Sequence, residues 1–322
     1  MDYNSHNVTG SRRRRIKKRR RFVLFFFILL CSCILITVSF LLKSKKVPPP
    51  TKQVLESTIK PSPAVLSVLQ DKGLEGAVEK ALEGTKGSYG IFIKNVKTNA
   101  VFTRNEHTSF DAASLYKLWI MAVAYNQIES GRLKKEQTLS QDVKVLNEKF
   151  DIASEAAEMT EGKVTLTVSE ALEKMITISD NYAALLLAEK VRLSTVKDYL
   201  KDKGFNESTV DTNGSTPKTT ASDIALFFEK LYTGQLGNAD STESMLSLLR
   251  NQRLNNKIPK NLPVGTVIAH KTGELSMYTH DAGIVYTEKG DYIIAVLSKS
   301  DNPEAAEGRV GDVSEGVFNY FN

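Results

Sequence analysis

Residues 112–125 read AASLYKLWIMAVAY, an apolar run interrupted by a single lysine. The run predicts a buried helix over residues 114–130, which Gly131 ends. Ser114 stands at the first position, where backbone N–H groups are unpaired and the helix dipole favours negative charge. Lys117 follows three residues later, so the two side chains share one helical face. A lysine in a dry cleft can lose part of its proton affinity, so the pair predicts a serine nucleophile activated by a lysine.

The spacing Ser-x-x-Lys carries little weight alone, because it occurs four times in the chain. The other pairs lie in a proline-rich stretch, at the start of a surface helix and beside a proline: Ser57 with Lys60, Ser194 with Lys197 and Ser215 with Lys218. Only Ser114 begins a strongly apolar helix directly after two small residues. Its position, rather than its spacing, favours a catalytic role.

A second polar motif, Ser-Asp-Asn, occurs at residues 179–181 and again at 300–302. The later copy has a structural explanation, since its asparagine precedes Pro303 and can cap a helix. The earlier copy lies between two predicted helices, where a tight turn can direct the hydroxyl of Ser179 and the amide of Asn181 into a cleft. A cap for the following helix is the competing interpretation.

Lys271, Thr272 and Gly273 form a third motif, at the end of a predicted strand. Lysine and threonine there can bind a substrate carboxylate, and a glycine lets a ligand approach the backbone closely. A lone Lys-Thr-Gly is also consistent with a simple strand-to-turn transition. The order of the three motifs, each on the type of element that its chemistry needs, favours a common site.

The predicted elements place strands at both ends of the globular part and helices between them. Helical spacing and caps predict helices over residues 64–83, 114–130, 167–177, 181–190, 194–203, 220–232 and 241–252, and after Pro303. Strand-like runs cover residues 88–94, 100–104, 266–272, 282–287 and 292–298. This order predicts an α+β fold of two lobes: an antiparallel sheet flanked by the N- and C-terminal helices, and an inserted all-helical lobe. The site is expected in the cleft between them.

The N-terminal part predicts a single-pass membrane anchor. Residues 1–21 hold nine Lys or Arg and one acid, a charge of +8, which leaves −2 for the rest because the whole chain carries +6. Residues 22–42 contain no charge and are long enough to span a bilayer as a helix. The charge asymmetry predicts a cytoplasmic N-terminus and an external domain. Residues 43–63, rich in proline and lysine, are expected to form a tether, and residues 64–322 a single globular domain that contains the three motifs.

Composition disfavours several other classes of protein. The nearly neutral globular part gives no basis for nucleic-acid binding. The four histidines show no metal-ligand spacing, so neither a metal nor another cofactor is expected. Both cysteines lie within residues 22–42, so the domain must fold without disulfides. A cleaved signal peptide is the alternative to the anchor, but the apolar run is long and ends in LLKSKKVPPP. The sequence does not indicate whether the protein is a monomer or an oligomer.

From residue 64 onward the chain resembles the class A β-lactamases and penicillin-binding proteins, members of the penicillin-recognising serine hydrolase superfamily. The resemblance rests on the motifs SLYK, SDN and HKTG in this order, on the strand HDAGIVY and on the order of helices and strands. It implies that Ser114 is the acylated nucleophile and Lys117 the neighbouring general base. Ser179 would relay a proton to the leaving nitrogen.

The resemblance also implies how a substrate is bound. Asn181 would bind the substrate amide, while Lys271 and Thr272, followed by Gly273, would hold its carboxylate. The oxyanion hole would consist of the backbone N–H groups of the nucleophile and of Glu274. The substrate would be a β-lactam or a peptidoglycan peptide.

Residues 204–223 depart from the class A pattern. The family carries a deacylating glutamate here in the pattern E-x-x-L-N, which this chain lacks, and the stretch is shorter than usual. Glu207 and Asp211 are the only acids before the cap formed by Thr219 and Thr220, and Glu207 is the candidate deacylation base. Three functions stay open: a β-lactamase, a DD-peptidase that β-lactams inhibit, and a β-lactam-binding module with little turnover. A serine-type glutaminase is disfavoured by the external location.

Overall fold

The computed structural model describes residues 71–211 and 215–322. The predicted basic tail (1–21), transmembrane helix (22–42) and tether (43–63) lie outside these residues, as does the predicted start of the domain at residue 64. Within the described ranges, no helix combines the length and the hydropathy needed to cross a membrane.

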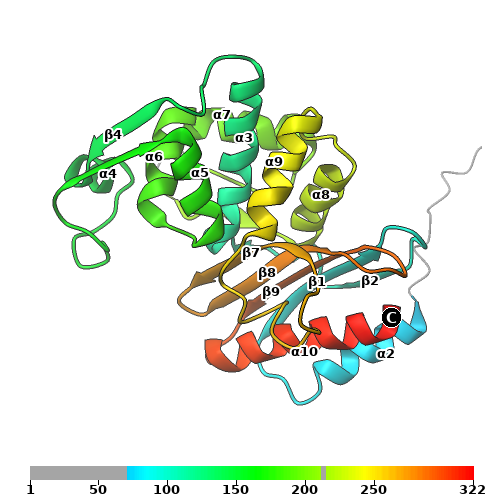
Figure 1. Ribbon diagram of the computed structural model, residues 1–322. Helices are drawn as coiled ribbons and strands as arrows, with labels where there is room; N and C mark the ends of the chain where they lie inside the picture. The colour runs from blue at the N-terminus through cyan, green and yellow to red at the C-terminus, as the bar shows by residue number, and fades with distance from the viewer. Residues whose placement is uncertain (1–70, 212–214) are drawn as a thin grey trace, which may run out of the picture. The chain divides into compact units, whose positions relative to one another are not determined.

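A five-stranded antiparallel sheet joins the two ends of the globular part (Figure 1). In spatial order its strands are β2 Val101–Arg104, β1 Ser88–Asn95, β9 Tyr292–Lys299, β8 Tyr278–Val285 and β7 Ile268–Leu275. β1 pairs with β9 along its whole length, so the first and last of the described strands lie side by side. The predicted α+β fold is confirmed, and β7 forms one edge of the sheet.

The β7–β8 hairpin is longer than the sequence predicts. Leu275 pairs with Tyr278, so the turn has only two residues and begins with Ser276. Ser276 has a φ of 51°, a conformation that glycine or asparagine usually supplies in such turns. Because no residue marks the turn, the predicted strands at 266–272 and 282–287 stop short of it.

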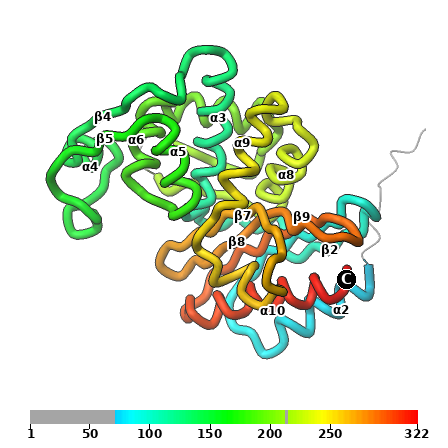
Figure 2. Tube along the Cα trace, viewed as in Figure 1, coloured from blue at the N-terminus to red at the C-terminus, as the bar shows by residue number. Residues whose placement is uncertain are grey.

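Two helices from opposite ends of the chain cover one face of the sheet. Figures 1 and 2 show α2 (Lys72–Ala81) beside α10 (Pro303–Phe321). The sequence predicts the first helix over residues 64–83, but it begins only at Lys72, because Asp71 is extended and caps it. Both begin at polar caps, Asp71 and Asn302, whose side chains accept backbone N–H groups of the first turn. The apolar layer between helices and sheet includes Leu74, Val78, Ile91, Ile93, Val296, Val310 and Val313.

The helical lobe lies against the other face (Figure 1). Its helices are α3 Lys117–Glu129, α4 Val143–Lys149, α5 Val168–Thr177, α6 Asn181–Val191, α7 Leu193–Lys203, α8 Ala221–Tyr232 and α9 Ala239–Arg250. It also contains two short ribbons that the sequence did not predict, β3 Phe110–Asp111 with β6 Lys218–Thr219 and β4 Thr138–Asp142 with β5 Lys163–Thr167. Helix α8 contacts β1, β8 and β9, and α9 contacts β7, so these two helices join the lobe to the sheet.

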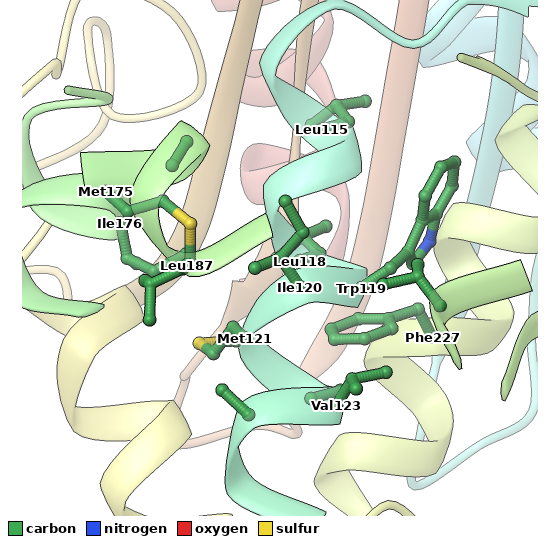
Figure 3. Packing of buried hydrophobic residues seen from close by; sticks show 14 of the residues in the cluster. Leu115, Leu118, Trp119, Ile120, Met121, Val123, Met175, Ile176, Leu187 and Phe227 are labelled. Atoms are coloured by element: carbon green, nitrogen blue, oxygen red, sulfur yellow. The ribbon is translucent and has the colours of Figure 1, made fainter. Parts of the chain in front are cut away.

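Helix α3 is the centre of the lobe. Its residues from Lys117 to Tyr125 are all buried, as expected for a helix that is apolar on every side. Figure 3 shows its packing against α5, α6 and α8 through Leu118, Trp119, Met121, Met175, Ile176, Leu187 and Phe227. This packing fixes the start of α3 in place, and the predicted nucleophile lies in the turn directly before it.

Candidate active site

Ser114 lies in a tight turn that leads into α3. Residues Ala113–Tyr116 form a 3₁₀ helix, η1, and the α-helix itself begins only at Lys117. The predicted α-helix from residue 114 is therefore wrong in its first turn. A 3₁₀ turn has three residues, so positions three apart share one face, and Lys117 follows Ser114 by this spacing. Ala113 has a φ of 44°, a strained conformation for a residue with a Cβ.

Lys117 is buried and engaged by the second motif. Its Nζ donates to the carbonyl oxygen of Ser179 at 2.6 Å and to Asn181 Oδ1 at 2.7 Å, and lies 3.2 Å from Ser179 Oγ. Burial lowers the pKa of Lys117 to about 8, while the carboxylates of Asp180 and Glu158 act in the opposite direction. A lysine with such a pKa is partly neutral near physiological pH and can accept a proton.

The motif at residues 179–181 forms the turn between α5 and α6. Ser179 has a φ of 60°, and Asp180 caps α6 by accepting the backbone N–H of Ala183 at 2.8 Å. The competing interpretation, a helix cap, thus holds for the middle residue. The flanking Ser179 and Asn181 instead contact Lys117.

Lys271 approaches the same serine from the sheet. It is buried in β7, and its Nζ donates to Ser179 Oγ at 3.0 Å and to the carbonyl oxygen of Thr272 at 2.8 Å. Burial and the charge of Lys117 lower the pKa of Lys271 well below its ordinary value. The Ser179 oxygen accepts from both lysines, which leaves its own O–H free to donate to a third group.

Gly273 allows β7 to pack against the nucleophile turn. A Cβ at this position would lie 3.3 Å from the carbonyl oxygen of Ala112, the Cβ of Ala113 and the Cγ of Leu115. Gly273 therefore allows close packing against η1, while the predicted approach of a ligand to the backbone at this residue stays a prediction. β7 is an edge strand, so alternate N–H groups on its outer side have no strand partner among the described residues. The carbonyl of Thr272 accepts from the Lys271 side chain. Glu274 lies two residues after Thr272, so its backbone groups face the same side of the strand.

Two buried groups beside β7 escaped the sequence analysis. Lys257 is fully buried, and its ammonium contacts the carboxylate of Glu274. His280 of β8 donates through Nε2 to the carbonyl oxygen of Asp111 at 2.8 Å and accepts through Nδ1 from the backbone N–H of Ser298, so it is neutral. Burial lowers its pKa to about 4. No motif marks either residue, since only the fold shows that they are buried.

His270, in β7, lies next to Lys271 and is hydrogen-bonded to neighbouring side chains on both ring nitrogens. Its Nδ1 lies 2.9 Å from Asp281 Oδ1, and its Nε2 lies 3.2 Å from Asn255 Oδ1. Asp281 also accepts the backbone N–H of Ile258 at 3.0 Å, so the pair fastens the segment before β7 to the sheet. Throughout residues 71–211 and 215–322, no group of three or more His, Cys, Asp or Glu could hold a metal ion.

The candidate base Glu207 has partners of its own. Its carboxylate lies 2.9 Å from His107 Nδ1 and accepts the hydroxyl of Thr220 at 2.8 Å, and its backbone N–H donates to Asp223 at 3.0 Å. The hydrogen bond to Glu207 raises the pKa of His107. In the described part of the chain, Glu207 forms no hydrogen bond to Ser114 or Lys117.

The sequence is similar to those of two β-lactamases. The chain is 23% identical over 271 residues to the extended-spectrum β-lactamase PER-1 of Pseudomonas aeruginosa, covering 77% of this chain and 87% of the relative. It is also 23% identical over 282 residues to β-lactamase VEB-1 of the same organism, covering 80% and 93%.

Solved structures share the fold. PBP-A superposes with a TM-score of 0.68 at 23% identity, covering 78% of this chain and 96% of that one. A β-lactamase from Sphaerobacter thermophilus has the same TM-score at 25% identity, covering 78% and 97%. The sequence model described as the β-lactamase enzyme family matches residues 73–321. Because this match spans most of the chain, the protein belongs to the β-lactamase enzyme family.

Proposed function

We propose that this protein is a serine hydrolase of the class A β-lactamase type, which opens β-lactams through an acyl-enzyme on Ser114. The observation that carries the proposal is the hydrogen-bonded set of Lys117, Ser179 and Lys271, three residues from distant motifs. The similarity to PER-1 and VEB-1, both named as β-lactamases, supports it.

In the proposed acylation, Lys117 in its neutral form accepts the hydroxyl proton of Ser114. Oγ then attacks the lactam carbonyl carbon, and the backbone N–H groups of Ser114 and Glu274 stabilise the negative charge on the oxygen. As the C–N bond breaks, Ser179 gives its proton to the leaving nitrogen. Lys117 returns a proton to Ser179 across their 3.2 Å contact, so the protons balance.

Substrate binding is proposed to use both lobes. The amide of Asn181 would donate to the carbonyl of the acylamide group from the helical side. From the sheet, Lys271 and Thr272 would bind the carboxylate, while Gly273 lets β7 lie close to η1.

A DD-peptidase acting on peptidoglycan peptides is the second candidate. It is favoured by the contacts of Glu207, because a carboxylate held by His107 and Thr220 is poorly suited to activating water at Ser114. If no other group activates the water, the acyl-enzyme would persist, and β-lactams would then inhibit the protein.

The two candidates differ in turnover. We expect the purified protein to hydrolyse a chromogenic cephalosporin through many turnovers, with intact mass showing an adduct of Ser114 only transiently. A stoichiometric adduct that persists without turnover would exclude the β-lactamase and favour the DD-peptidase or a binding module.

The same assay tests Glu207. We expect Glu207→Gln to change the deacylation rate by less than about threefold, because its carboxylate is already engaged. Glu106→Gln is the matched control, since Glu106 also lies near His107, at 3.8 Å. A loss of about 100-fold in deacylation alone, confined to Glu207→Gln, would identify Glu207 as the base.

We further propose that residues 22–42 anchor the protein in the cell membrane with the hydrolase domain outside. Their lack of charge and the nine cations before them support this arrangement. Protease added to intact cells, or to spheroplasts where an outer membrane is present, should therefore degrade the domain. A domain that is protected until the cells are lysed would contradict the proposal.

A further inference from the structure

Glu158 lies at the outer end of the proposed site. The side-chain amide of Asn181 joins it to Lys117: Oδ1 accepts from Lys117 Nζ at 2.7 Å, and Nδ2 donates to Glu158 Oε1 at 2.6 Å. These two bonds fix which end of the amide faces the lysine. Since an amide nitrogen carries two N–H donors, one remains for a substrate carbonyl. Glu158 would then lie beside the acylamide group of a bound substrate.

Buried groups hold Glu158 in this place. The next residue, Met159, donates its backbone N–H to the hydroxyl of Tyr182 at 3.1 Å, and its carbonyl oxygen accepts from Asn147 Nδ2 at 2.8 Å. Tyr182 and Asn147 are 5% and 8% exposed, and Tyr182 directly follows Asn181 at the start of α6. The loop between α4 and β5 is thereby fastened to the helix that carries Asn181.

The charge around Glu158 is negative. Residues 151–162 contain four acids and no lysine or arginine. Glu158 itself is exposed and, in the part of the chain that the structure describes, forms no ion pair. Its negative charge acts to raise the pKa of Lys117, which lies on the other side of the Asn181 amide. A carboxylate so placed attracts a cation that enters from solvent and repels an anion.

We propose that Glu158 is a specificity-determining residue, which favours acyl donors that carry an ammonium group next to the acylamide carbonyl. This inference rests on the proposed function, because it places the acylamide of the substrate on Asn181. The preferred substrates would be β-lactams or peptides with a free amine on the acyl side. An acyl group with a carboxylate at the same position would be disfavoured.

Three penicillins that differ only in this charge test the proposal. Benzylpenicillin is neutral at the α-carbon of its side chain, ampicillin carries an ammonium there and carbenicillin a carboxylate. The readout is the second-order rate constant for acylation of Ser114, from intact mass, or kcat/KM where the adduct turns over. Relative to Glu158→Gln, the wild type should favour ampicillin over benzylpenicillin by about three- to tenfold and disfavour carbenicillin by a similar factor.

Two further variants sharpen the comparison. Glu161→Gln removes an exposed acid of the same loop and should keep the wild-type ratios, whereas Glu158→Lys should favour carbenicillin. The ratios should also shrink at high ionic strength. Ratios in Glu158→Gln equal to those of the wild type would overturn the inference while leaving the proposed function intact. Failure of all three penicillins to acylate wild-type Ser114 would overturn both.

Discussion

Ser114→Ala is expected to abolish the covalent adduct with β-lactams and to lower turnover by about 10³-fold or more. The variant lacks the oxygen that forms the ester in the proposed mechanism. Ser114 is half-buried in η1 beside Ala112 and Ala113, so an alanine fits the turn and the fold should persist. Intact mass after incubation with benzylpenicillin measures the adduct directly.

Ser194→Ala provides the matched control. Ser194 also precedes a lysine by three residues, and it lies in the first turn of α7. Its replacement should leave the adduct unchanged, which would establish that position rather than spacing makes a serine reactive. Adduct formation in Ser114→Ala would mean that the nucleophile is a different residue.

The sequence predicts the lobes and the motif positions because both depend on local patterns. The apolar run after Ser114 is long enough to identify a buried helix, and the hydrogen bonds from Lys117 and Lys271 to Ser179 agree with a common site. Three weak motifs became informative through their order. The individual roles of these residues stay predictions until variants are measured.

Other features depend on contacts that no local pattern encodes. The 3₁₀ turn η1 lies where β7 packs against the chain just before α3. This close packing requires Gly273, which is far from Ser114 in the sequence. Lys257 looks like a surface lysine, and only the folded sheet shows that it is buried against Glu274. Glu158 belongs to an acidic loop without periodicity, and its position depends on Tyr182.

The second large effect concerns Lys117, whose pKa burial lowers to about 8. A base must be deprotonated to accept the Ser114 proton, so the acylation rate should rise with pH and level off above about 8. Below that value the neutral fraction, and with it the rate, should fall by about tenfold per pH unit. A lysine with its ordinary pKa would instead give a rate that still rises near pH 10.

The variant Lys117→Arg distinguishes the role of Lys117 as a base from the effect of its positive charge alone. A guanidinium keeps the positive charge but cannot give up its proton in this pH range, so acylation should fall by about 10³-fold and lose the rise toward pH 8. Lys174→Arg, at an exposed position on α5, should retain both the rate and the profile. The measurement is the rate of adduct formation on Ser114 between pH 6 and 10. If Lys117→Arg kept the inflection of the wild-type pH profile, the titrating group would be a different residue. Lys271 would then be the first residue to replace, because it is the other buried lysine whose Nζ contacts the Ser179 hydroxyl.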